Sequence, residues 1–122
     1  MNFLQNESLL KQVCLEEHLR LNNKNQIHTN EILYLQSEWN YTHVFTSDNR
    51  KLLSSFTLKI LEKRILNKAF IRINRGFLVN LNHVSQINES GRGGEVTLLN
   101  GSVFPISRRK FSTVKYLFEN SI

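Results

Sequence analysis

Apolar and polar residues alternate with a period of two along most of this chain, and the pattern predicts short β-strands with one buried face. Residues 32–35 are apolar at every position, which predicts a strand that is buried on both faces. Residues 22–25 contain only Asn and Lys and predict a turn. The predicted strands are residues 13–21, 32–35, 41–46, 51–54, 70–74, 77–79, 83–88, 95–99 and 102–106.

Residues 36–40 interrupt the alternation and predict a loop ahead of the strand that begins at Tyr41. Two interpretations of this loop are open. The cluster Glu38-Trp39-Asn40-Tyr41 could form a recognition loop, or the loop could be pinned by a packed Trp39.

Two segments change to the spacing of an amphipathic helix. Residues 57–66 place apolar side chains three and four positions apart, and Thr57 is a suitable N-cap. A second helix is predicted after Ser107, which we expect to be its N-cap, with apolar positions between 111 and 118. Its first turn would hold the three cations at 108–110, which oppose the helix dipole. That cost is easier to understand if an anion such as phosphate binds there.

Residues 70–80 combine a strand, a turn and a second apolar segment. The alternation breaks at Arg75-Gly76, so we expect the turn to display Arg75. Phe77 and Val79 in the following segment are both expected to be buried. A rigid element that presents Arg beside Asn suits recognition of a polyanion, although a surface strand with solvated charges would have the same pattern.

Turn signals divide the last third of the chain. Residues 91–94 are rich in glycine and predict a flexible turn, but no Lys-Ser/Thr pair or helix follows to make a phosphate-binding loop. Asn100-Gly101 predicts a β-hairpin with a type I′ turn, because both residues tolerate positive φ. Pro105 lacks an amide donor, so its strand is expected at a sheet edge or to end there.

The fold class predicted is therefore mainly β with two short helices. At 122 residues the chain is long enough for one domain with its own core. Residues 1–10 have no clear partner pattern and are expected to be an N-terminal arm or linker remnant. The domain is then expected to span residues 11–122.

Charge is distributed unevenly along the chain. Residues 1–48 hold three cations and six anions, whereas residues 49–122 hold 13 cations and four anions. A basic second half indicates a polyanionic partner, either nucleic acid or an anionic membrane surface. A merely soluble basic protein would also show this charge.

No catalytic or metal site is predicted. Cys14 is the only cysteine, and the four histidines lack metal-ligand spacing with it. Ser107 lies in no nucleophile elbow, so we expect neither an enzyme nor a cofactor. Neither a signal peptide nor an apolar run of membrane-spanning length is present, so a cytoplasmic protein without membrane insertion is expected.

Taken together, several of these segments resemble the LytTR DNA-binding family, a group of bacterial response-regulator output domains. The resemblance covers roughly residues 15–118. It rests on Ile32-Leu33-Tyr34-Leu35, Asn40-Tyr41, the helix at 57–66, Phe70-x-Arg72-Ile73-x-Arg75-Gly76-Phe77-x-Val79-Asn80, Asn100-Gly101 and Pro105-Ile106-Ser107-Arg108-Arg109.

The resemblance implies an elongated stack of small antiparallel β-sheets that binds double-stranded DNA as a bacterial transcription regulator. Loops would enter successive major grooves of direct-repeat sites, which suggests a homodimer on the DNA. Members of the family often carry a receiver domain, and this chain has no room for one. Either the chain is a fragment, or its regulation comes through a partner such as an upstream sensor or regulatory protein, through dimerisation or through its abundance.

The resemblance also implies three DNA-contact regions, from the loop–strand junction, the 70–80 segment and the start of the last helix. The residues concerned are Asn40, Tyr41, Thr42, His43, Arg72, Asn74, Arg75, Ser107, Arg108, Arg109 and Lys110. Asn74 and Gly76 stand where the family commonly has His and Ser, so the resemblance supports Arg75 more strongly than these two neighbours.

Arg75 and Arg109 are expected to read bases, because Arg can bridge O6 and N7 of guanine. Arg108 and Lys110 are expected to hold phosphates, which position the protein without specifying sequence. Two other classes stay open: a β-module that binds RNA or single-stranded nucleic acid through exposed aromatic residues, and a protein-interaction domain.

Overall fold

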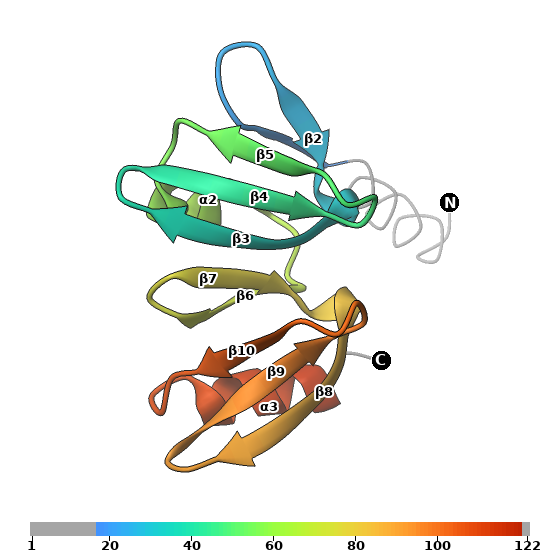
Figure 1. The fold of residues 1–122 in the computed structure, drawn as a ribbon, viewed down its shortest axis with the longest axis vertical. Coiled ribbons are helices and arrows are strands. Elements are labelled where there is room, and N and C mark those ends of the chain that lie inside the picture. Colours follow the sequence, from blue (N-terminus) through green and yellow to red (C-terminus); the bar gives the residue numbers. More distant parts are fainter. Residues whose placement is uncertain (1–16, 121–122) are drawn as a thin grey trace, which may run out of the picture.

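Three antiparallel sheets follow one another along the long axis of the molecule (Figure 1). The computed structural model describes residues 17–120. A two-stranded sheet, β1-β2, lies at one end, and a three-stranded sheet with the order β10-β9-β8 lies at the other. Between them is a five-stranded sheet with the order β5-β4-β3-β7-β6. The expectations for residues 1–10, Val13, Cys14 and Leu15 fall outside the described residues.

The strands are short, as the alternation predicts. The ten strands of the described residues are β1 (His18–Arg20), β2 (Gln26–His28), β3 (Ile32–Glu38), β4 (Tyr41–Thr46), β5 (Lys51–Ser54), β6 (Phe70–Asn74), β7 (Phe77–Asn80), β8 (Val84–Ser90), β9 (Gly93–Leu98) and β10 (Val103–Ile106). The helices of the same residues are α2 (Leu58–Arg64), α3 (Phe111–Glu119) and the 3-10 turns η1 (Thr29–Glu31) and η2 (Leu81–His83). The mainly β fold with two α-helices is confirmed, and β2 is a strand that the pattern did not predict.

Strand β3 is the centre of the five-stranded sheet. Its first four residues, 32–35, are all buried, which confirms a strand covered on both faces. However, β3 continues to Glu38, which pairs with Tyr41 on β4. The loop predicted over 36–40 is therefore wrong in length: only residues 39 and 40 form the turn. The polar side chains of the strand end had hidden its pairing with β4.

Helix α2 covers one face of this sheet and is capped as predicted. The Thr57 side chain accepts a hydrogen bond from the Ile60 amide at 3.3 Å. Leu58 and Leu61 are buried in a core cluster with apolar residues of the two-stranded and five-stranded sheets. The helix ends at Arg64, slightly before the predicted boundary.

A second core cluster joins the five-stranded sheet to the three-stranded sheet and α3. Val79 is fully buried in it, as predicted. Phe77 is only partly buried, so the prediction for this residue is wrong in degree. Its ring stacks on Phe104 with 4.5 Å between centroids and packs against the edge of this cluster.

Both turns of the three-stranded sheet, β8–β9 and β9–β10, contain a glycine with positive φ. The β9–β10 turn has a Gly101 amide that donates to the Leu98 carbonyl at 2.9 Å, and Gly101 has a φ of 92°. Asn100 has no positive φ, so the turn is not type I′ but a three-residue loop closed by a left-handed glycine. The β8–β9 turn is also shorter than predicted, because Gly93 and Gly94 belong to β9.

The segment before α3 differs most from its prediction. Ser107 is not the N-cap: residues 107–110 form a separate turn in which the Lys110 amide donates to the Ser107 carbonyl at 3.0 Å. The helix starts at Phe111, with Lys110 in the cap position and no side-chain cap. The Ser107 amide is held by the Ile73 carbonyl of β6 at 2.9 Å, which fixes the chain ahead of the helix. The basic residues 108–110 therefore precede the helix instead of forming its first turn.

Pro105 lies on β10, an edge strand of the three-stranded sheet, as its missing amide donor predicts. Across residues 17–120, neither α-helix has the length and apolar character required to span a bilayer.

Candidate nucleic-acid interface

Four turns lie along one long side of the molecule, on the left in Figure 1. We call this surface the turn edge. It consists of the β3–β4 turn (39–40), the β6–β7 turn (75–76), the β8–β9 turn (91–92) and the β10–α3 turn (107–110). The antiparallel connections create it, because every second turn of a meander returns to the same side of its sheet.

Hydrogen bonds link three of these turns, one bond within the five-stranded sheet and one between it and the three-stranded sheet. The Ser37 amide next to the β3–β4 turn donates to the Gly76 carbonyl at 2.8 Å. The Asn74 side-chain amide donates to the Pro105 carbonyl at 2.6 Å, just before the β10–α3 turn. These bonds hold neighbouring turns in a fixed relation, so the turn edge is a preorganised surface.

The Arg72 side chain builds the turn that carries Arg75. Its guanidinium donates to the carbonyl oxygens of Asn74 at 3.0 Å and Arg75 at 2.6 Å. It also donates to Glu62 Oε1 of α2 at 2.6 Å. Arg72 is thus only partly exposed and already engaged by three acceptors within the protein.

Asn74 supports the same turn through both polar groups of its side chain. Its Oδ1 accepts a hydrogen bond from the Gly76 amide at 2.8 Å, while its amide nitrogen is bound to Pro105. With both groups of the side chain occupied, Asn74 fixes the backbone on which Arg75 stands. Arg75 itself is exposed.

An open cleft of about 490 Å³ separates the β6–β7 turn from the β10–α3 turn. It brings together residues that are more than 30 positions apart in the chain. Its lining consists of Arg72, Asn74, Arg75, Ser107, Arg109 and Lys110. Arg108 is exposed and lies outside this lining. The cleft can hold an anionic or hydrogen-bond-accepting group between cations from two different sheets.

The β3–β4 turn contributes a different kind of surface. Asn40 and Tyr41 are exposed, whereas Thr42 is fully buried and its hydroxyl donates to the Phe56 carbonyl at 2.8 Å. His43 is partly buried and its Nε2 contacts Glu38 Oε1. Thr42 is therefore inaccessible to a ligand in this structure, and its prediction as a contact residue is wrong.

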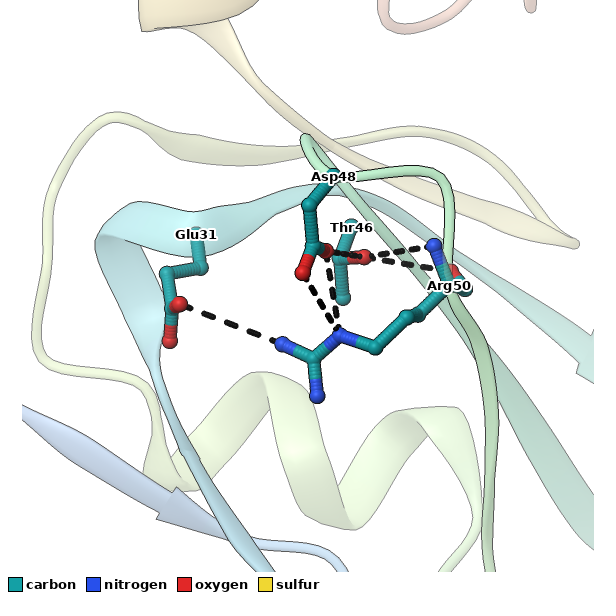
Figure 2. A network of polar contacts seen from close by, with 4 residues as sticks. All are labelled: Glu31, Thr46, Asp48 and Arg50. Atoms are coloured by element: carbon teal, nitrogen blue, oxygen red, sulfur yellow. Dashed lines mark hydrogen bonds and ion pairs between the residues drawn. The ribbon is translucent and has the colours of Figure 1, made fainter.

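The exposed cations of the turn edge take no part in the ion pairs of the described residues. Arg50 is in the β4–β5 turn, on the right in Figure 1. Its Nε lies 2.9 Å from Asp48 Oδ2, and its Nη2 lies 3.9 Å from Glu31 Oε1 (Figure 2). Thr46 and Arg50 bind the Asp48 carboxylate and hold its pKa below the ordinary value, with the Thr46 hydrogen bond the largest cause. Within residues 17–120, no acid lies at ion-pair distance from Arg75, Arg92, Arg108, Arg109 or Lys110. The positive charge of the turn edge is therefore left without a protein partner.

Arg92 of the turn edge was not selected from the sequence, and Trp39 was considered there only as part of a possible recognition loop or as a packed residue. Arg92 follows Gly91 at the tip of the β8–β9 turn and is exposed, a location that the glycine-rich segment could have indicated. Trp39 is 93% exposed, so the interpretation of a loop pinned by a packed Trp39 is wrong. The described residues contain no group of three or more His, Cys, Asp or Glu side chains that could hold a metal ion.

The sequence matches the model of one protein family and is similar to several known proteins. The model of the LytTr DNA-binding domain family matches residues 22–119. The transcriptional regulatory protein BtsR of Salmonella typhi is 28% identical over 112 residues, which are 91% of this chain and 44% of that protein. The sensory transduction protein LytT of Bacillus subtilis is 29% identical over 92 residues, 75% of this chain and 38% of that protein. The chain thus spans less than half the length of these relatives.

A solved LytTr DNA-binding domain from Bacillus cereus has the same fold. It superposes with a TM-score of 0.67 at 20% sequence identity, over 85% of this chain and 95% of that domain. The fold of this chain is therefore one already known from a solved structure.

Proposed function

Because this chain belongs to the LytTr DNA-binding domain family, we propose that it recognises specific double-stranded DNA sequences through its turn edge and regulates bacterial transcription. One observation carries the assignment of the surface. Arg75 and Arg109, from two different sheets, line one open cleft with Lys110, and no acid pairs with them in the described chain. Unpaired cations on a preorganised surface suit the phosphates and base edges of a duplex.

Base reading is assigned to Arg75 and Arg109, and phosphate holding to Arg108 and Lys110. Arg75 stands at the tip of a braced turn, where a planar guanidinium can make a bidentate contact with guanine. Asn40, Tyr41 and His43 of the β3–β4 turn form a further contact region. Arg72 and Asn74 hold the neighbouring turns in position through side-chain hydrogen bonds to backbone carbonyl oxygens. Ser107 anchors the last turn through its backbone amide.

The arrangement of the turns suits a protein that follows one side of a duplex. The turn edge runs along the long axis of the molecule (Figure 1), so its separate turns can enter successive major grooves, about 34 Å apart on one face of B-DNA. Two copies on a direct repeat would use the same turns twice. This arrangement, the homodimer, the cytoplasmic location and an upstream sensor or regulatory protein are all parts of the proposal.

Selection from a random-sequence duplex library tests the proposed function. The protein is expected to enrich one recurring sequence, present as a direct repeat, and the affinity for it should fall steeply with salt. The slope of log affinity against log salt is expected to be about −0.9 for each phosphate neutralised. Enrichment of no sequence together with flat salt dependence would contradict the proposal.

Competition by nucleic acids of other kinds separates the main alternatives. Trp39 and Tyr41 are exposed, and base stacking on such residues is typical of proteins that bind single strands. If the proposal is correct, unlabelled duplex displaces the labelled selected duplex from the protein. Single-stranded DNA or RNA of equal length does not. Preferential displacement by a single strand would favour the RNA or single-strand alternative.

The Lys110 side chain gives a more local test of the salt dependence. Lys110→Ala is expected to weaken binding to all duplexes by a similar factor and to reduce the magnitude of the salt slope by about one unit. Lys24→Ala is the control, because Lys24 is exposed in the turn between β1 and β2 at the far end of the stack. An equal change in both variants would show that the effect comes from net charge alone.

A further inference from the structure

The tip of the β3–β4 turn carries the most exposed large apolar side chain of the described residues. Trp39 is 93% accessible, and none of the aromatic or cation contacts of the fold involves it. Burial of a tryptophan is normally among the largest apolar contributions to a core or interface. Here the indole contributes nothing to the core, so its presence on the surface calls for another explanation.

The backbone makes Trp39 an unfavourable choice for the turn itself. Its φ is 56°, in the left-handed region where a bulky side chain is strained and glycine is not. Asn49 is the other non-glycine residue with positive φ among residues 17–120, and Asn tolerates this region well. Local folding would therefore favour Gly or Asn at position 39, whereas strained residues often belong to functional sites.

The surroundings of Trp39 indicate which partner it meets. The turn joins β3 and β4, and its neighbour Ser37 is hydrogen bonded to Gly76 of the turn that carries Arg75. The turn that carries Trp39 lies on the same side of the molecule as the β6–β7 turn, which carries Arg75 (Figure 1). A polyanion held by Arg75 and the cleft would extend past the β3–β4 turn.

We infer that Trp39 is an uncharged DNA contact, which packs its indole against deoxyribose and thymine methyl groups of the duplex that the cations hold. The inference rests on the proposed function and adds to it a residue of different chemistry. Apolar contact with the thymine methyl is an established means of reading a major groove. Because this contact displaces no counterion, it adds affinity without adding to the salt dependence.

Trp39 is the only tryptophan of the chain, so its emission reports on this contact alone. The first experiment titrates the whole protein with the duplex recovered by selection. It follows the anisotropy of a label on the DNA and the emission of Trp39 in the same samples. Binding is expected to change the Trp39 emission and to protect it from acrylamide quenching. Anisotropy that rises while emission and quenching stay unchanged would overturn the inference and leave the proposed function intact; absence of any rise would overturn both.

The second experiment compares Trp39→Gly with Leu99→Ala. Glycine adopts positive φ without strain, so Trp39→Gly is expected to keep or raise the melting temperature while it weakens DNA binding about tenfold. Its salt slope should equal that of the unchanged protein. Leu99 is 66% exposed in the β9–β10 turn on the opposite side, and Leu99→Ala should leave affinity unchanged.

Each other result of this comparison argues against the contact. Unchanged affinity in Trp39→Gly, or an equal loss in Leu99→Ala, would show that the indole does not touch DNA. A lower melting temperature would assign Trp39 a role in the fold. Loss of self-association, with DNA affinity per protomer retained, would make the residue part of an interface between two copies of the chain.

Discussion

The Arg72 side chain shows how a polar residue next to an interface can serve the protein's own backbone. Alternation along β6 places Arg72 and Asn74 on one side of the strand, where both were expected to meet DNA. In the structure the guanidinium of Arg72 returns to the carbonyl oxygens of Asn74 and Arg75 and to Glu62. A carbonyl oxygen in a turn is a strong acceptor that must be satisfied. The Arg75 turn is therefore positioned by its own strand.

A double-mutant cycle separates positioning by Arg72 from direct contact with DNA. If Arg72 acts through Arg75, Arg72→Ala weakens binding to the selected duplex, but adding it to Arg75→Ala causes little further loss. The measurement is the dissociation constant of the two single variants and the double variant. Additive losses, with a further reduction of the salt slope by about one unit, would instead mean that Arg72 binds a phosphate itself.

At the scale of elements, the contact between β9 and the β10–α3 turn positions the second half of the cleft. A Cβ on Gly93 would lie 2.5 Å from the Ile106 carbonyl oxygen and 3.1 Å from the Arg108 amide nitrogen. Both are backbone atoms, which cannot move aside as a flexible side chain can. Glycine at this position thus lets the basic turn lie directly against the strand.

Substitution of Gly93 is expected to affect stability and DNA binding together. Gly93→Ala should lower the free energy of unfolding by about 1–3 kcal/mol, because it forces two backbone segments apart. The displaced turn carries Arg109 and Lys110, so binding to the selected duplex should also weaken. Gly76→Ala is the control for stability, since its Cβ would meet nothing closer than Ser37 Oγ at 3.6 Å. A Gly93→Ala variant as stable as Gly76→Ala would contradict the close approach.

The β4–β5 turn is stabilised by the network around Asp48 shown in Figure 2. Hydrogen bonds from Thr46 and Arg50 lower the pKa of the Asp48 carboxyl. Because folding lowers this pKa, the stabilising contribution is complete above the pKa of the unfolded chain, about 4, and is lost as the pH falls through the folded pKa. The melting temperature of Asp48→Asn should thus be lower than that of the unchanged protein near neutral pH, and the two should converge below pH of about 4. A difference that persists at acidic pH would mean that the carboxylate charge is not the cause.

The elements were predictable from the sequence to different degrees, and particular residues explain why. The period of two located β4 and β5, and the Thr57 cap located α2, because these signals are local. The end of β3 was missed, since pairing of Glu38 with Tyr41 depends on a partner strand and not on apolar side chains. Ser107 was misassigned as a cap because its amide is held by Ile73, 34 positions earlier in the chain. The cleft could not be predicted, because its two walls come from different sheets.

For the whole molecule, the position of the ion pairs matters more than the net charge. The whole chain has a formal charge of +6, but not every cation is free, because Arg50 and Arg72 are paired with acidic side chains. The cations of the turn edge have none within the described residues, so their field is directed at the solvent on one side. This asymmetry gives the elongated stack one face suited to a duplex.

We propose that Arg75 reads a base from a turn that Arg72 and Asn74 hold in position. The most direct measurement is the affinity of Arg75→Ala, with Lys24→Ala as a charge-matched control, for the selected duplex and for a scrambled duplex at equal salt. We expect Arg75→Ala to lose about 1–3 kcal/mol on the selected duplex, far less on the scrambled one, and to lose its preference at one base pair. Lys24→Ala should change both only slightly. An equal loss on the two duplexes would make Arg75 a phosphate contact, and no loss on either would place the interface elsewhere.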